Sequence, residues 1–239
     1  MKLAKSAGVV LLLLSTSVRA EEALSPWSGD VDFGYTKLTG NSDDSTMTGK
    51  IAAVWESQPW KWGVQADALG SKSEQQRTAE KYGLLTRLSY NFTDKNYVFA
   101  RATYESDKFS GYDYQATATA GLGWNLYDLP TFSWDVELGA GFRTSKVDQN
   151  ALGEDENEPI VTAGTVINYQ LSDSADFNQY LSYEKGSDID IFYSSSELAV
   201  KIIDALAMKL SYNYKYTSDV PVGTNDTDTE TIVSLSYSF

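Results

Sequence analysis

The chain of 239 residues contains no cysteine and no histidine, and it has only five prolines and three methionines. The absence of cysteine excludes disulfides and a lipoprotein anchor. The absence of histidine excludes Ser-His-Asp and Cys-His triads and the histidine-rich sites that zinc favours. The composition therefore predicts no catalytic triad, no cofactor and no metal site.

Long hydrophobic runs are also missing. The longest, at 8–14, is much shorter than the roughly 20 residues of a membrane-spanning helix. Two lysines precede this run, and Val18-Arg19-Ala20 follows it as a small-x-small cleavage motif. We interpret residues 1–20 as a cleaved secretory signal and residues 21–239 as the mature domain. An uncleaved anchor is the alternative.

Basic residues are scarce, 19 against 33 acidic ones, and the formal net charge is −14. Removal of the signal takes away three basic residues and changes this charge to −17. Nucleic-acid binding needs a basic surface, so we expect no nucleic-acid partner. Aromatic residues make up 13% of the chain, although its mean hydropathy is −0.34. This combination is typical of a membrane barrel, whose strands face lipid on one side and a wet lumen on the other.

The last eight residues alternate strictly between apolar and polar. Val233, Leu235, Tyr237 and Phe239 fall on one face, and three serines fall on the other. This period of two is the pattern of an amphipathic strand. A terminal strand that ends in phenylalanine, on an exported chain, resembles the assembly signal of bacterial outer-membrane barrels. We therefore expect these four side chains to be recognised by the barrel assembly machinery; an ordinary amphipathic strand is the alternative.

Similar alternation recurs along the chain in twelve segments. The best patterned are 27–35, 47–55, 60–68, 82–92, 112–126, 132–142, 208–216 and 229–239, and weaker ones lie at 97–106, 160–171, 175–184 and 190–203. Tilted membrane strands need about 9–11 residues, and an even number brings both termini to the periplasmic side. The predicted fold class is all-β: a transmembrane antiparallel barrel of about twelve strands, of the bacterial outer-membrane type.

The connections between these segments sort by length. Short turns are expected at 57–59, 93–96, 127–130, 172–174 and 203–205, and they alternate with loops at 38–45, 71–80, 105–111, 144–159, 185–189 and 217–228. All six tryptophans lie near the amino terminus or a short turn, which predicts a periplasmic girdle. The expected opposite belt consists of Tyr35, Tyr82, Tyr104, Tyr112 and Tyr216.

The polar face of the segments carries charges of both signs. We predict as lumen charges Lys50, Lys61, Asp67, Arg87, Arg101, Asp113, Asp135, Glu137, Arg143, Lys209 and Lys215, with Asp30, Asp32, Glu56 and Lys201 in the same series. The two signs nearly balance, so the excess of acids is assigned to loops such as 153–158. Balanced charges permit either a closed, ion-paired interior or a polar pore, and twelve strands give an intermediate lumen. The glycine pairs Gly121/Gly123 and Gly139/Gly141 predict either wall curvature or room for a solute.

Several segments together resemble the YdiY-like salt-induced outer-membrane proteins, also called the domain of unknown function 481 family. They are 34–43 (GYTKLTGNSD), 106–112 (SDKFSGY), 121–126 (GLGWNL), 137–143 (ELGAGFR), and 220–221 (VP) followed by 228–231 (DTET). The resemblance spans nearly all of the mature chain. It implies an outer-membrane barrel associated with osmotic or salt stress, and it implies no transport substrate and no catalytic residue.

Three functions remain open at this point. The two-signed lumen favours an outer-membrane channel for small solutes or ions. A closed structural barrel that stabilises the envelope is the main alternative. A lipid-modifying enzyme that uses paired carboxylates, for example Asp135 and Glu137, is the third. The expected partners are outer-membrane lipids, the barrel assembly machinery during biogenesis, and small solutes or ions.

Overall fold

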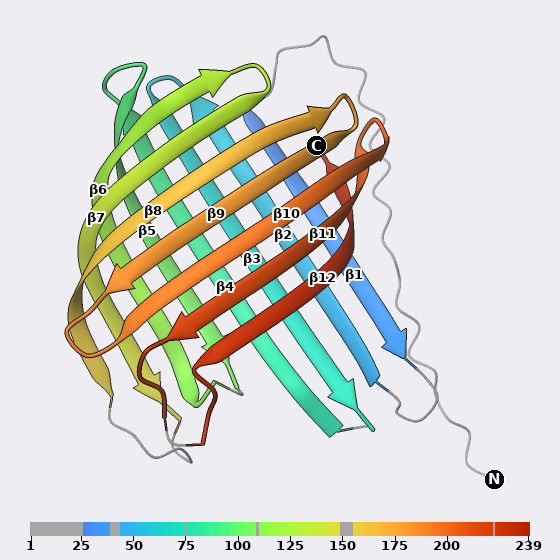
Figure 1. Cartoon of the computed structure of the whole chain (residues 1–239), viewed down its shortest axis with the longest axis vertical. Helices are drawn as coiled ribbons and strands as arrows, with labels where there is room; N and C mark the ends of the chain where they lie inside the picture. The colour runs from blue at the N-terminus through green and yellow to red at the C-terminus, as the bar shows by residue number, and fades with distance from the viewer. Residues whose placement is uncertain (1–25, 39–43, 75, 109, 149–154, 222) are drawn as a thin grey trace.

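The computed structural model describes residues 26–38, 44–74, 76–108, 110–148, 155–221 and 223–239. Twelve antiparallel strands follow one another around a closed barrel, in which the first strand pairs with the last (Figure 1). The predicted fold class is therefore confirmed. Within the described part of the chain, no helix is long and apolar enough to cross a membrane. The expected signal at 1–20 lies outside the described residues.

The strands are longer than the alternating segments that predicted them. They are β1 (Trp27–Leu38), β2 (Asp44–Ser57), β3 (Trp60–Ser73), β4 (Gln76–Asn91), β5 (Asn96–Asp107), β6 (Tyr112–Leu129), β7 (Phe132–Val147), β8 (Glu156–Ser172), β9 (Ala175–Lys185), β10 (Asp190–Ile203), β11 (Leu206–Thr217) and β12 (Thr227–Ser238).

The two ends of the barrel differ in their connections. The turn end, at the top of Figure 1, holds both the start of β1 and the end of β12 together with the five short turns, all near their predicted positions. The loop end is the opposite end of the barrel, where the other strand ends lie. The loop predicted at 71–80 is wrong, because β3 continues to Ser73, β4 begins at Gln76, and Glu74 turns with a φ of 49°. This hairpin is polar on both faces, so it lacks the alternation that marks a strand against lipid.

The inside of the barrel is polar and the outside is apolar. Large hydrophobic side chains such as Phe33, Leu84 and Phe142 are exposed on the outward face, whereas the largest fully buried side chains are Arg143 and Glu158. Soluble proteins have the reverse arrangement. The outward face is therefore the surface that lipid covers.

Aromatic side chains gather near both rims of the outward face. Trp55 lies opposite both Trp27 and Trp62 at the turn end, and the rings of Trp27 and Trp62 pack edge to face with centroids 5.7 Å apart. Near the loop end, the other four predicted tyrosines are exposed, but Tyr112 is only 6% exposed. A β-bulge between Tyr112 and Tyr114 shifts the alternation by one residue and turns Tyr112 inward, so its assignment to the outer belt is wrong.

The charged lumen as candidate functional site

Strand pairing places nearly all of the predicted lumen charges on the inward face. This face carries Lys50, Lys61, Asp67, Arg87, Arg101, Asp135, Glu137, Arg143, Lys209 and Lys215. The exception is Asp113, which is exposed beside the bulge that turns Tyr112 inward. The prediction for Asp113 is wrong, because the extra residue of the bulge removes it from the inward series.

The same face also carries charges that the sequence did not reveal. They are Lys81, Glu105, Asp107, Glu158, Glu184, Glu197, Asp228 and Glu230. Several were assigned to loops, yet the series Glu158, Ile160, Thr162 and Gly164 already alternates in phase with the inward face. Carboxylates therefore outnumber basic side chains in the lumen, and the near balance predicted from the sequence is wrong.

Near the turn end, Lys209 of β11 connects three strands. Its ammonium lies 3.2 Å from Asp32 and 3.5 Å from Asp30 on β1, and 4.0 Å from Glu197 on β10. The Ser238 hydroxyl on β12 donates to Asp30 at 2.6 Å. These contacts hold the first and last strands together where the barrel closes.

In the middle of the lumen, two arginines converge on Glu137. Arg101 binds Oε2 of Glu137 at 2.6 Å, Arg87 binds Oε1, and the Tyr97 hydroxyl donates to Oε1 at 2.9 Å. The guanidinium of Arg101 also lies 3.1 Å from the Tyr180 hydroxyl on β9, on another part of the wall. Glu137 is 4% exposed, so this carboxylate is fully engaged. Its neighbour Asp135 lies on the same face of β7.

The inward glycines accommodate aromatic rings. A Cβ atom on Gly123 would overlap the ring of Tyr97, and one on Gly139 would lie 3.2 Å from the ring of Phe99. The absence of these side chains lets both rings approach the wall formed by β6 and β7. The guanidinium carbon of Arg87 lies over the Phe99 ring, 5.0 Å from the ring centroid, which is within cation–π distance.

Toward the loop end, an ion pair crosses the lumen. Lys215 of β11 lies 2.6 Å from Glu105 of β5, and these two strands lie on opposite sides of the barrel. Lys81 of β4 lies 3.3 Å from Glu105 and 3.2 Å from Glu230 of β12. Beside this cluster is a cavity of about 410 Å³, whose lining includes Glu230. The interior here is thus part ion-paired and part open.

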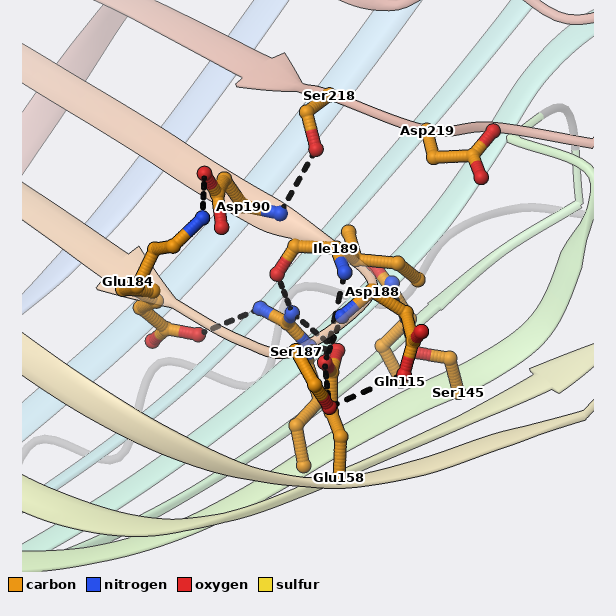
Figure 2. A network of polar contacts seen from close by, with 12 residues as sticks. Gln115, Ser145, Glu158, Glu184, Ser187, Asp188, Ile189, Asp190, Ser218 and Asp219 are labelled. Atoms are coloured by element: carbon orange, nitrogen blue, oxygen red, sulfur yellow. Dashed lines mark hydrogen bonds and ion pairs between the residues drawn. The ribbon is translucent and has the colours of Figure 1, made fainter.

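A second network ties the β9–β10 loop into the lumen (Figure 2). Arg143 is 1% exposed; it lies 2.5 Å from Oε1 of Glu158 and 3.2 Å from Glu184, and it donates to the carbonyl of Ile189. The other oxygen of Glu158 accepts hydrogen bonds from the backbone N–H groups of Asp188 and Ile189, at 2.8 and 3.4 Å. Residues 186–189 are therefore fastened to the inner wall.

Hydrophobic contacts reinforce this loop. The side chain of Ile189 is 3% exposed and clusters with Tyr112, Val147 and Ile191.

Outside the strands, the hydrogen bond from Lys146 lowers the pKa of Asp155 below its usual range. Among the described residues, no group of acidic side chains is arranged to hold a metal ion. The four residues of the predicted assembly signal, Val233, Leu235, Tyr237 and Phe239, are all exposed on the outward side.

An apolar outside, a charged inside and twelve antiparallel strands define a transmembrane β-barrel of the bacterial outer-membrane type. The fold is similar to that of the NanC porin, with a TM-score of 0.50 and 10% identity over 88% of this chain and 97% of that one. The KdgM porin has a TM-score of 0.48 and 13% identity, with coverage of 89% and 99%. The low identity to NanC indicates a shared fold only.

The family is established by the sequence itself. The chain belongs to the family described as "Protein of unknown function, DUF481", whose model matches residues 31–239. It is also 31% identical over 217 residues to the uncharacterized protein YdiY of Escherichia coli (strain K12), covering 90% of this chain and 84% of that protein. The resemblance found in the sequence motifs is thereby confirmed.

Proposed function

We propose that this protein is a narrow outer-membrane channel for small cations and small polar solutes, with its loop end facing outward. The observation that carries the proposal is the excess of carboxylates over basic side chains on the inward face. Charges enclosed by a low-dielectric wall act on a passing ion more strongly than loop charges, which salt screens over about 8–10 Å. The lumen therefore favours cations.

The cross-lumen contacts set the width of the passage. The pair Lys215–Glu105 joins opposite walls, and the contact of Arg101 with Tyr180 joins β5 to β9. Large solutes cannot pass without breaking them. We therefore expect a small conductance rather than that of a wide general porin.

Recordings from purified protein in planar bilayers under a KCl gradient test the proposal. The wild type is expected to conduct weakly with a reversal potential of cationic sign, and Lys215→Met is expected to raise both conductance and cation preference. Lys185→Met is the matched control, because Lys185 is outward, exposed and paired with Asp190 at 2.7 Å. Conductance no higher than that of heat-unfolded protein, for both wild type and Lys215→Met, would refute the channel.

A closed structural barrel is the second candidate. The specific observation in its favour is the inward fastening of residues 186–189 by Arg143 and Glu158, which narrows the loop end. A closed barrel predicts no conductance in the wild type or in Lys215→Met, together with loss of envelope integrity when the protein is deleted. Detergent sensitivity of the deletion strain measures that second property.

The hypothesis of a lipid-modifying enzyme has less support. The carboxylate of Glu137 is engaged by two arginines and a tyrosine, so it has no free position for acid–base chemistry. We propose that Asp135 and Glu137 order the lumen and that the protein is not an enzyme. Phospholipase and acyltransferase assays with vesicle lipids are expected to show no activity above that of heat-unfolded protein.

Location and regulation complete the proposal. We propose export by a signal at 1–20, insertion by the barrel assembly machinery, and increased synthesis under osmotic or salt stress. Membrane fractionation, carbonate extraction and immunoblotting after a rise in NaCl test these points. Release of the protein by carbonate would contradict the location, and an unchanged protein level would contradict the stress association.

A further inference from the structure

The wall of the barrel is split at its closing seam. The strands β1 and β12 pair only from Asp30↔Ser238 to Phe33↔Leu235. If this register continued, Gly34–Leu38 would lie opposite Glu230–Ser234, but no such pairs form among the described residues. Figure 1 shows the two strands meeting near the carboxyl terminus and diverging toward the loop end. We call the facing segments Tyr35–Leu38 and Glu230–Val233 the seam split.

Neither strand is irregular in this region. β1 remains paired with β2 as far as Leu38↔Asp44, and β12 remains paired with β11 as far as Tyr216↔Thr227. The two ordered edges are still in contact at Gly34, where a Cβ atom would lie 2.7 Å from the carbonyl oxygen of Val233, and beyond this point no bridge joins them among the described residues. Membrane barrels normally close every edge, because an unpaired backbone group in hydrocarbon costs several kcal/mol. Two edges facing each other without pairing point to polar atoms, from water or a ligand, between them.

The 410 Å³ cavity lies at this split. Its lining includes Tyr35 and Val233, whose side chains are exposed on the outward face, and Thr48, Ser71, Asp107 and Glu230, which belong to the inward face. Residues of both the inward and the outward face thus line one cavity. Its volume is within the range of about 300–1,000 Å³ that small-molecule sites occupy.

The lumen side of the cavity is acidic. Asp107, Asp228 and Glu230 line it, and Glu105 lies just beyond. Lys81 lies 3.2 Å from Glu230 and Lys215 lies 2.6 Å from Glu105, so these four carboxylates share the space with two lysines and the local charge is negative. The lipid side is formed by Tyr35 and Val233. A cationic head fits the first environment and a hydrocarbon tail fits the second.

We propose that the seam split is a lateral portal that binds an amphiphile with a cationic head and a single hydrocarbon tail. The head lies in the lumen beside Asp228 and Glu230, and the tail leaves the barrel between Tyr35 and Val233. The portal rests on the membrane location given under the proposed function, but it does not depend on ion conductance.

Cysteine cross-linking tests the split itself, since the native chain has no cysteine. Tyr35→Cys/Val233→Cys is compared with Val31→Cys/Tyr237→Cys in proteoliposomes. All four side chains point outward. Gly29 and Phe239 exchange two backbone hydrogen bonds, and every second residue pair along the same register occupies the equivalent position, so the two cysteine pairs are matched. The control pair is registered and is expected to oxidise rapidly to a disulfide, because paired strands hold their Cα atoms about 5.5 Å apart.

The Tyr35→Cys/Val233→Cys variant is expected to stay reduced under the same oxidant and to be joined only by a longer bismaleimide. Heat-modifiable migration verifies that both variants are folded. Oxidation of this pair as fast as the control would show a closed seam and would overturn the portal. This measurement does not depend on ion conductance, so it distinguishes failure of the portal from failure of the channel.

Photolabelling tests the ligand. Proteoliposomes receive a photoactivatable dodecyl-ammonium probe, a dodecyl-phosphate probe or a dodecyl-maltoside probe, and labelled peptides are mapped. The ammonium probe is expected to label β1 and β12 about tenfold more than the phosphate probe, the factor expected for one or two partly screened charge pairs. Asp228→Asn/Glu230→Gln should remove this preference, whereas Asp190→Asn, on the outward face of β10, should keep it. Equal labelling by all three probes, or no label above that on β7, would overturn the cationic ligand.

Discussion

Replacement of Arg143 by methionine provides the sharpest test of the lumen network. The side chain is 1% exposed, it interacts with Glu158 and Glu184, and it donates to the carbonyl of Ile189. Arg143→Met keeps most of the volume and removes the charge, so Glu158 remains as a buried anion. Breaking a buried ion pair in this way costs about 3–5 kcal/mol, because the remaining charge has lost its partner.

The matched control is Lys146→Met on the same strand. Lys146 pairs with Asp155 near the loop end, and both side chains are over two-fifths exposed. Exposed pairs contribute about 0–1 kcal/mol, so this variant is expected to be nearly neutral. Adding Glu158→Gln to Arg143→Met should restore part of the loss, because the unpaired buried charge is then gone.

The assay is reversible urea unfolding in lipid vesicles, followed by tryptophan fluorescence and by heat-modifiable migration. Arg143→Met is also expected to release residues 186–189, which lose their link to the wall, and limited proteolysis between β9 and β10 measures this. A loss below about 1 kcal/mol, the value for exposed pairs, together with unchanged proteolysis would show that the network does not hold the loop.

Further predictions concern assembly, packing, selectivity and pH. Deletion of Phe239 is expected to lower the amount of heat-modifiable protein in the outer membrane; a normal amount would contradict a role in assembly. Gly123→Val should cost about 1–3 kcal/mol by overlap with an aromatic ring, whereas Gly164→Ala, with its nearest neighbour at 3.6 Å, should be nearly neutral in the same urea titration. In bilayers, Glu230→Gln should reduce cation preference, whereas Asp155→Asn should leave it unchanged; the opposite result would place selectivity at the mouth. The lowered pKa of Asp155 means that its pair with Lys146 stabilises the fold above about pH 4 and that this contribution is lost as pH falls through the lowered pKa. An Asp155→Asn variant whose stability responds to acid as the wild type does would contradict this.

Much of this barrel could be predicted from the sequence, because its determinants are local. A period of two marks a strand with lipid on one side, and short clusters of Asp, Asn, Ser and Pro mark the turns. The serines and apolar residues of 232–239 therefore identified the last strand, and the tryptophans marked the turn end. The strand number, the polarity of the two faces and the family motifs all follow from such short-range patterns.

The partners of each charge depended on the tertiary structure. Glu158 lies in an acidic run that resembles a solvated loop, yet β8 begins before it and turns it toward Arg143. The bulge at Tyr112 reverses the expected direction of two side chains, because one inserted residue changes the face of a strand.

The extent of pairing at the seam was likewise not predicted from the sequence. Period-two alternation breaks beyond Tyr35 in β1 and before Val233 in β12, where Leu38 and Ile232 take inward positions, yet both strands continue through this region. Alternation determines which way a side chain points, and it carries no information on how far two distant strands stay paired. That extent depends on the curvature and closure of the whole barrel, because the last strand meets the first only after the others have set their positions.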